Sequence, residues 1–194
     1  MNVTVRRVTS WADALDRARI TAGKPAIHKE PSSEWKRKML LCRHSPIRTV
    51  MYDIVFTDLK SWVSVHLVRH SKFAEHFVST QRPDRTQAEN QDRDSYPQGA
   101  KVTHQIFTNA AELIEISKKR LCSLASKETR EAWEAVVRRL REIGEVEMAD
   151  AMVPECVHHG GMCPELKGCG KCPSIWEHEH SPRTGAGGDW WVPQ

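Results

Sequence analysis

No long apolar run occurs in this sequence of 194 residues, because even the most apolar stretch, residues 62–68, is interrupted by Ser64 and His66. A membrane-spanning helix needs about 20 consecutive apolar residues, so a transmembrane protein is not expected. The first residues include arginines but neither an apolar core nor a small-residue cleavage site, which argues against a secretory signal. Charge of one sign is also scarce: 29 Lys and Arg against 25 Asp and Glu leave a net charge of +4, too little to require nucleic acid as a partner. We expect a cytoplasmic protein whose anionic ligands are small.

The composition is typical of one globular domain, with 39% hydrophobic and 28% charged residues. Six cysteines are present, and in a reducing compartment they do not indicate a disulfide framework. Cys42 and Cys122 lie in apolar stretches, where we predict them to be buried like small hydrophobic residues. The other four cysteines occur together within residues 156–172.

Apolar periodicity predicts the local elements. Alternating apolar residues predict strands at residues 1–8 and 49–58. Helical spacing and capping residues predict four helices, at residues 10–23, 32–45, 108–121 and 126–140. Residues 61–70 fit a helix, although a strand stays open, and residues 83–99 are almost entirely polar, which predicts a loop.

Basic and polar residues concentrate in residues 69–85, directly after an apolar element. Arginine can bind phosphate with two parallel hydrogen bonds, and the hydroxyls of Ser79 and Thr80 add neutral donors. These residue types are those of a nucleotide-phosphate site. The alternative is a solvated loop whose charges pair locally.

The order of residues in this segment resembles a known signature. Residues 69–71, Arg-His-Ser, are followed by seven residues and then Ser79. The flavin-dependent thymidylate synthases carry Arg-His-Arg, seven residues and then Ser. Residues 43–48, Arg-His-Ser-Pro-Ile-Arg, are similar to the His-x-Pro segment of that family.

Two further matches follow along the chain in the family's order. Arg93 and Pro97 precede Asn109 in the way that the family's Arg-x-x-x-Pro precedes its Asn-Ala-Arg, and Arg120 matches an arginine of the family's next helix. Four ordered motifs are more specific than any one of them. The resemblance covers about residues 33–165.

The resemblance implies an α/β (α+β) protomer in which helices pack on a curved antiparallel sheet. It also implies a homotetramer with active sites between subunits, and the apolar residues Trp62, Val63, Val65 and Leu67 suit such an assembly. We expect the synthase-like domain to span residues 1–154. A Cys-rich segment then covers residues 155–176, and residues 177–194 lack periodicity, which predicts a disordered tail.

The resemblance further implies transfer of a one-carbon unit from methylenetetrahydrofolate to C5 of a pyrimidine deoxynucleotide, with FAD as the mediator and NADPH as the reductant. Conversion of dUMP to dTMP is the first expectation, and dCMP as the substrate and hydroxymethyl as the added group stay open. No cysteine of the enzyme attacks the pyrimidine in this chemistry.

Site residues follow from the matched positions. The implied flavin contacts are His44, Arg69, His70 and Asn109. The implied nucleotide contacts are Ser79, Thr80, Gln81, Arg82, Arg93 and Arg120. Among these, Arg120, Ser79 and His70 are the implied catalytic residues. Arg120 would stabilise the negative charge that builds on the pyrimidine as its C5 becomes nucleophilic.

Some positions depart from the family pattern. Ser71 and Ala111 stand where the family has arginines, and Gln81 stands where it has a phosphate-binding arginine. A second function therefore stays open: a nucleotide- or nucleic-acid-binding protein on the same scaffold that has lost flavin chemistry.

The C-terminal cysteines suggest a separate site. The thiolates of Cys156, Cys163, Cys169 and Cys172 could close a tetrahedral, structural zinc site. His158 or His159 could replace one thiolate. The alternative is that these cysteines are simply small residues of a Gly-rich loop.

Overall fold

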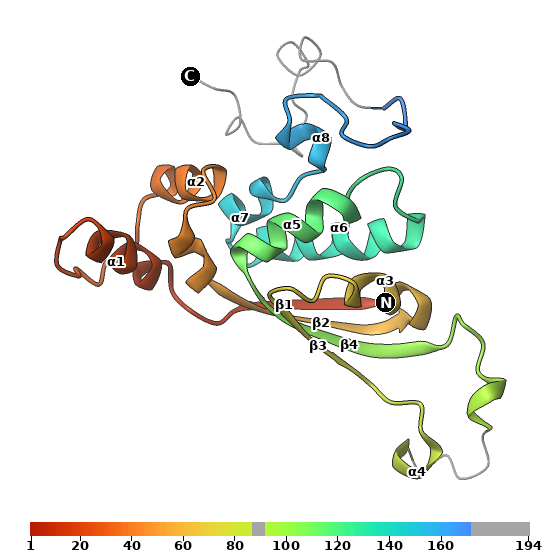
Figure 1. The fold of residues 1–194 in the computed structure, drawn as a ribbon. Coiled ribbons are helices and arrows are strands. Elements are labelled where there is room, and N and C mark those ends of the chain that lie inside the picture. The colour runs from red at the N-terminus through yellow and green to blue at the C-terminus, as the bar shows by residue number, and fades with distance from the viewer. Residues whose placement is uncertain (87–91, 172–194) are drawn as a thin grey trace.

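The computed structural model describes residues 1–86 and 92–171 (Figure 1). Its strands are β1 (Asn2–Arg7), β2 (Met51–Lys60), β3 (Ala74–Val78) and β4 (Lys101–Asn109). The first helices are α1 (Trp11–Thr21), α2 (Ser33–Leu41), α3 (Ser61–Val68) and α4 (Pro83–Thr86). The later helices are α5 (Ala110–Arg120), α6 (Lys127–Glu142), α7 (Val146–Ala151) and α8 (Glu155–His158). Two 3₁₀ helices are η1 (Ser45–Thr49) and η2 (Arg93–Ser95).

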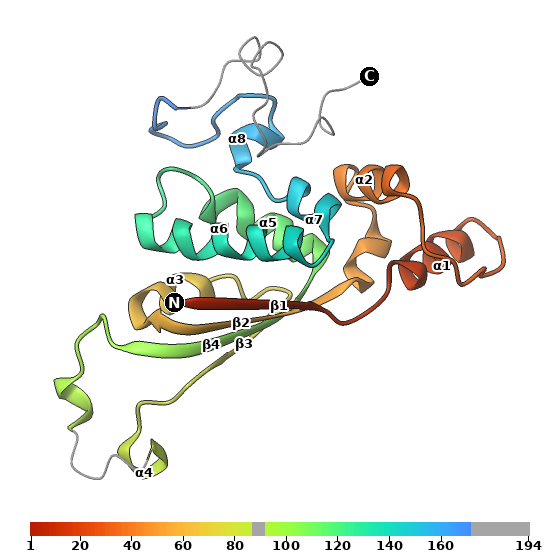
Figure 2. The same cartoon turned by 180° about the vertical axis from the view of Figure 1, so that it is seen from behind.

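The strands form one antiparallel sheet in the order β1-β2-β4-β3. Helices α5, α6 and α7 lie over one face of this sheet, and both views show that no described helix covers the other (Figures 1 and 2). The register between β2 and β4 shifts between Phe56 and Leu59, and a bulge of this kind bends a strand. The predicted fold class, helices packed on a curved antiparallel sheet, is confirmed.

The core lies between the sheet and the helices. On β2, the alternate residues Tyr52, Ile54 and Phe56 are fully buried toward the helices because successive side chains of a strand point to opposite faces. On α6, residues at helical spacing are buried, among them Trp133, whose indole N–H donates to the Ser117 hydroxyl of α5 at 2.8 Å. Burying each large apolar side chain contributes about 1.5–3 kcal/mol, so this layer fixes the helices on the sheet.

Glu145, in the turn between α6 and α7, joins distant parts of the chain. Its carboxylate accepts hydrogen bonds from the Trp11 indole at 3.0 Å and the Tyr52 hydroxyl at 2.7 Å, and pairs with Arg7 at 2.7 Å. Glu145 is 7% exposed. Burial and the Glu145 carboxylate raise the pKa of Tyr52, so this phenol keeps the proton that it donates. One acidic side chain therefore ties β1, α1 and β2 to the helical layer.

The sequence predictions fail at some elements. Periodicity missed β3 and β4, and the predicted helix at residue 108 begins at Ala110 because residues 101–109 form β4. Residues 61–68 form a helix, α3. Val63 and Leu67 lie in the core of the protomer, so the prediction that they provide a surface for assembly is wrong, whereas Val65 is 57% exposed.

Two cysteine predictions also need correction. Cys42 is exposed and Cys122 only half-buried, because both lie just past helix ends: Cys42 caps α2, and Cys122 follows the cap residue of α5. None of the helices in residues 1–86 and 92–171 has the length and apolar character needed to cross a membrane. The predicted disordered tail, residues 177–194, lies outside the described residues, as does part of the Cys-rich segment.

Replacing Glu145 by Ala is expected to lower the free energy of unfolding by about 3–5 kcal/mol, because it leaves two buried donors and a cation without their acceptor. Urea denaturation followed by tryptophan fluorescence measures the change. The matched control is Glu142→Ala, which removes an exposed carboxylate paired with Arg139 and is expected to cost less than about 1 kcal/mol. Equal losses in the two variants would contradict the role given to Glu145.

Candidate functional site

The candidate site depends on where α5 begins. Asn109, the last residue of β4, caps α5 by accepting a hydrogen bond from the backbone N–H of Glu112 at 3.0 Å. The next backbone N–H, of Ala110, donates to the carbonyl of Val50 at 2.9 Å. Both bonds hold the start of α5 on the sheet. Eleven residues later the helix ends at Arg120, which places this side chain beside the end of α3.

Arg120 is half-buried and carries a polar atom without a partner. Its Nε is buried and has no hydrogen-bond partner among the described residues. Burial, and then the charge of Arg69, lower the pKa of Arg120, although a guanidinium stays protonated at neutral pH. An unsatisfied buried donor costs about 1–3 kcal/mol, so this atom is well suited to an acceptor on a ligand.

His70 presents a second such atom. Its Nε2 is buried without a partner in the described part of the chain. Burial, followed by the charges of Arg120 and His76, lowers the pKa of His70 to about 4. The imidazole is therefore neutral at pH 7, and it can accept or donate one hydrogen bond at Nε2 according to its tautomer.

His66 completes a group of four side chains that we call the cation cluster: Arg69, Arg120, His66 and His70. The His66 Nδ1 lies 3.0 Å from the Thr129 hydroxyl of α6. Burial, and then Arg120 and Arg69, lower the pKa of His66. After burial, the positive charge of neighbouring arginines is thus the cause that lowers the pKa values of His66 and Arg120, and Arg120 contributes in the same way at His70. An anion would relieve this repulsion.

Two histidines support His70 from the sheet. The Nε2 of His76 lies 2.8 Å from the His70 carbonyl, and its Nδ1 lies 2.9 Å from the Nε2 of His104. A carbonyl only accepts, so His76 donates this bond through Nε2, whereas the donor of the bond between His76 and His104 depends on their tautomers. The Thr108 hydroxyl also donates to the Phe73 carbonyl at 2.9 Å. The segment of residues 70–73 is therefore held to the sheet through the carbonyls of His70 and Phe73.

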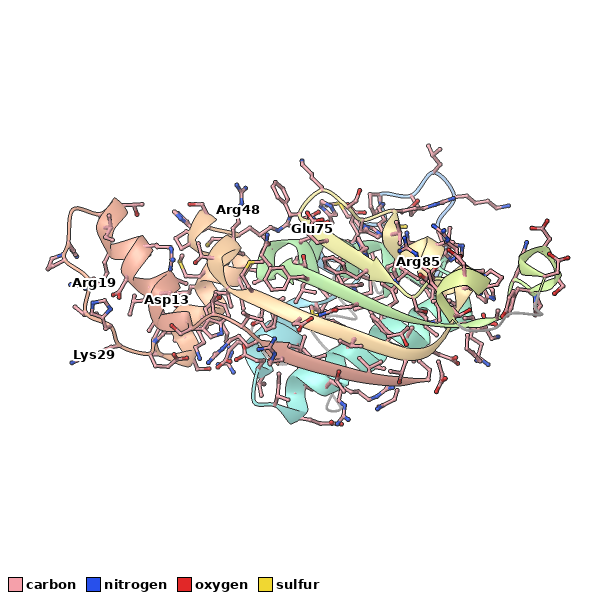
Figure 3. The ribbon with its side chains drawn as sticks, turned by 90° about the horizontal axis from the view of Figure 1, so that it is seen from below. Asp13, Arg19, Lys29, Arg48, Glu75 and Arg85 are labelled. Atoms are coloured by element: carbon pink, nitrogen blue, oxygen red, sulfur yellow. The ribbon has the colours of Figure 1, made fainter. Side chains whose placement is uncertain are left out.

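These supporting histidines had no motif to identify them. His76 lies on β3 and His104 on β4, and both fall at positions that face the helices. The alternation of inward and outward positions along the two strands was the one sequence signal that could have indicated that these histidines face the helices. Glu75, the neighbour of His76, lies on the opposite face of β3, on the side of the sheet seen in Figure 3, so it is not placed to polarise His76.

The polar residues after β3 form local bonds. Ser79 extends the pairing with β4, because its N–H donates to the Thr103 carbonyl at 2.8 Å and its hydroxyl accepts from the Thr103 N–H at 3.0 Å. The Thr80 hydroxyl accepts from the N–H of Arg82, and the Arg82 guanidinium pairs with Asp84 at 2.6 Å. Gln81 is half-buried. These local bonds agree with the alternative given above for residues 69–85, a solvated loop whose charges pair locally.

The structure therefore brings together only part of the predicted site. Arg69, His70 and Arg120 lie near one another, whereas no hydrogen bond or ion pair within the described ranges joins residues 79–82 to them. His44 is exposed at the start of η1, and Arg93 is the first residue of η2. The oxygen of the Asn109 side chain is used in capping α5.

The C-terminal cysteines lie elsewhere, beyond the end of α5. Cys156, Cys163 and Cys169 line one cavity, while Cys172 lies outside the described residues. Within residues 1–86 and 92–171, no three His, Cys, Asp or Glu side chains already stand in a metal-binding group. Hydrogen bonds from the Ser123 side chain and the Lys171 N–H lower the pKa of the Cys169 thiol. The zinc site of the four C-terminal cysteines stays a prediction.

The fold is shared with solved structures of nucleotide-methylating enzymes. The chain is similar to flavin-dependent thymidylate synthase ThyX from Helicobacter pylori complexed with FAD and dUMP, with a TM-score of 0.64 and 15% identity over 78% of this chain and 100% of that one. A second structure of that enzyme with FAD and dUMP gives a TM-score of 0.64 and 16% identity, over 78% of this chain and 99% of that one.

A further structure of this fold is the UMP/dUMP methylase PolB from Streptomyces cacaoi, bound with 5-Br dUMP. It has a TM-score of 0.58 and 12% identity over 77% of this chain and 94% of that one. No family model and no curated protein matches the sequence. The chain has the fold of the flavin-dependent thymidylate synthases, which confirms the resemblance of its motifs at the level of the fold.

The stability of the protein is expected to fall as the pH drops from about 6.5 to about 4. Burial is the main cause that lowers the pKa of His70, His104 and His158 to about 4, whereas the unfolded chain takes up these protons near pH 6.5. Protonation thus favours the unfolded state, and this contribution to stability is complete only above pH 6.5.

Urea denaturation at several pH values tests this dependence. His104→Gln is expected to make the fall in unfolding free energy shallower, because it removes one of the three groups, and the control His44→Gln alters an exposed side chain. An unchanged slope in folded His104→Gln would contradict the prediction.

Proposed function

We propose that this protein is a flavin-dependent methylase of pyrimidine deoxynucleotides, which transfers a one-carbon unit from methylenetetrahydrofolate to C5 of dUMP to form dTMP, with NADPH as the reductant. The observation that carries this proposal is the cation cluster, in which Arg120 and His70 each present a buried atom without a partner. Such atoms, beside a second arginine, favour an anionic, hydrogen-bonding ligand. The fold, shared with structures that hold FAD and dUMP, supports the same conclusion.

Arg120 is the proposed catalytic group. Its guanidinium is half-buried, and in that environment a charge interacts more strongly than in water. A fixed cation beside the pyrimidine stabilises negative charge as it develops, without reorganising at the moment of reaction. Neutral His70 is proposed to hold a ligand by its free Nε2, while His76 and His104 keep the backbone of His70 in place.

The residues present fit a flavin. The unpaired Nε2 of His70 and the guanidinium of Arg69 offer polar contacts to it, and His44 and Asn109 are the further proposed contacts. Because the oxygen of Asn109 caps α5, its NH₂ group is the donor that remains for the cofactor. Bound FAD would supply the reducing equivalents that convert the transferred one-carbon unit to a methyl group.

The nucleotide contacts are proposed to come from two copies of the chain. Ser79, Thr80, Gln81, Arg82 and Arg93 would bind nucleotide in a homotetramer whose sites are shared between subunits. Within the described ranges, no hydrogen bond or ion pair joins residues 79–82 to Arg120 in one protomer, which suits this arrangement. Exposed apolar side chains also support assembly: Val65 is 57%, Phe73 51% and Phe77 59% exposed.

A second function follows from the missing arginines. Ser71 is exposed and has no cationic group, and Ala111 is half-buried against the core, so neither can replace the charge that the family has there. A nucleotide-binding protein without flavin chemistry would keep the cation cluster but would not bind FAD. Protein that stays colourless after incubation with FAD would favour this second function.

Arg120→Ala is expected to lower kcat for dUMP methylation about 100-fold or more, with a much smaller effect on the Kd for dUMP, because the contact is strongest in the transition state. Arg93→Ala is expected mainly to weaken dUMP binding, and the difference from wild type should shrink at high salt as screening weakens the contact. Steady-state kinetics and calorimetric titration measure the two effects.

The matched control is Arg17→Ala, which removes an exposed arginine of α1 far along the chain from the cluster. It is expected to leave both constants unchanged. Small and equal effects of Arg120→Ala and Arg93→Ala, in variants that are folded by circular dichroism, would contradict the proposed site.

A further inference from the structure

Four of the six cysteines line one cavity beyond the end of α5. They are Cys122, Cys156, Cys163 and Cys169, and the cavity has a volume of about 170 Å³. Cys122 belongs to the turn after α5, Cys156 to α8, and the other two to the irregular segment that follows α8. Parts of the chain that are far apart in sequence thus bring their thiols to the same place.

Individual contacts show how close these segments lie. The side chain of Ser123, the neighbour of Cys122, hydrogen-bonds the Cys169 thiol, and the Lys171 N–H donates to the same sulfur at 3.4 Å. A Cβ added at Gly168 would lie 3.5 Å from the Cys163 sulfur. Cys169 therefore lies next to the turn of Cys122, and Cys163 lies against the residue that precedes Cys169.

Charged groups hold the walls of this cavity together. Lys119 of α5 pairs with Glu155 of α8 at 2.6 Å and with Glu165 of the following segment at 2.8 Å. Lys118 and Lys171 contribute to the lining. A metal ion with four thiolates carries a net charge of −2, and these lysines supply the compensating positive charge.

We propose that Cys122, Cys156, Cys163 and Cys169 bind one zinc ion as four thiolates, and that this site anchors the C-terminal segment to the end of α5. Four sulfur ligands in tetrahedral geometry are the preference of Zn²⁺. Each thiol gives up its proton to solvent as it binds. The site has no open position, so it is structural, and it differs from the set expected from sequence because Cys122 takes the place of Cys172.

Zinc binding requires the four sulfurs to converge, since Zn–S bonds are about 2.3 Å long and the described side chains do not yet form a metal group. Cys163 and Cys169 lie on backbone outside helices and strands, which can adjust by side-chain rotation and small loop shifts. The metal would then fix a segment that the described contacts hold mainly by surface ion pairs, each worth about 0–1 kcal/mol.

The test is the zinc content of the full chain, purified without chelator and analysed by mass spectrometry of the metals. Wild type is expected to hold about one zinc per chain. Each of the single substitutions Cys122→Ser, Cys156→Ser, Cys163→Ser and Cys169→Ser is expected to lower the zinc content several-fold and to lower the melting temperature, because binding at a structural site adds to folding stability. Cys42→Ser and Cys172→Ser are the controls and are expected to keep the metal.

Wild-type protein without zinc would overturn the proposal, as would zinc loss in Cys172→Ser together with zinc retention in Cys122→Ser. Iron with sulfide in place of zinc would also overturn it. If the serine variants do not fold, titration of wild type with a mercurial reagent decides: zinc should be released as four thiols react, with Cys172→Ser behaving as wild type. Because zinc content is measured without FAD or dUMP, the outcome is independent of the proposed methylase activity.

Discussion

The junction between β4 and α5 is the constraint on which the candidate site depends. The side chain of Asn109 caps the helix, and the N–H of Ala110 bonds to the Val50 carbonyl of the neighbouring chain segment. These contacts fix the start of α5 on the sheet, and the buried face of the helix fixes its rotation. Arg120 is the last residue of α5, so its position depends on the hydrogen bonds of Asn109 and Ala110 at the start of the same helix. A residue expected to contact a flavin is therefore also one that orients the proposed catalytic arginine.

The free-energy cost of burying Arg120 beside Arg69 explains why the candidate site favours an anionic ligand. Burying a guanidinium beside a second arginine is unfavourable without an anion, and the histidines around Arg120 respond by staying neutral. The partly buried hydrogen bonds from His104 through His76 to the His70 carbonyl keep the segment after α3 in place despite that cost. We therefore expect this arrangement to favour a negatively charged partner, and the proposed nucleotide and flavin both carry negative charge.

The sequence predicted the helices and the motif positions better than it predicted the sheet. Helical spacing in α6 was clear, but the buried face of β4 carries His104 and Thr108 as well as apolar residues, so alternation of polarity did not mark it as a strand. Separate motif matches named His70 and Arg120 as site residues, and in the structure the two side chains lie near one another. The motifs could not find His76, because its bond to His104 joins residues 28 apart in sequence. The position of Cys122 in the cysteine-lined cavity was hidden for the same reason, since only folding brings the turn after α5 beside α8.

We propose that the protein binds a pyrimidine nucleotide at the cation cluster, beside a flavin, and methylates it. The most direct measurement is the mass of the nucleotide after dUMP is incubated with FAD-loaded protein, NADPH and methylenetetrahydrofolate, with dCMP in a parallel reaction. We expect dUMP to be converted to dTMP, and we expect no conversion when FAD is omitted from flavin-free protein. Recovery of unchanged dUMP and dCMP from protein that holds FAD would contradict this proposal.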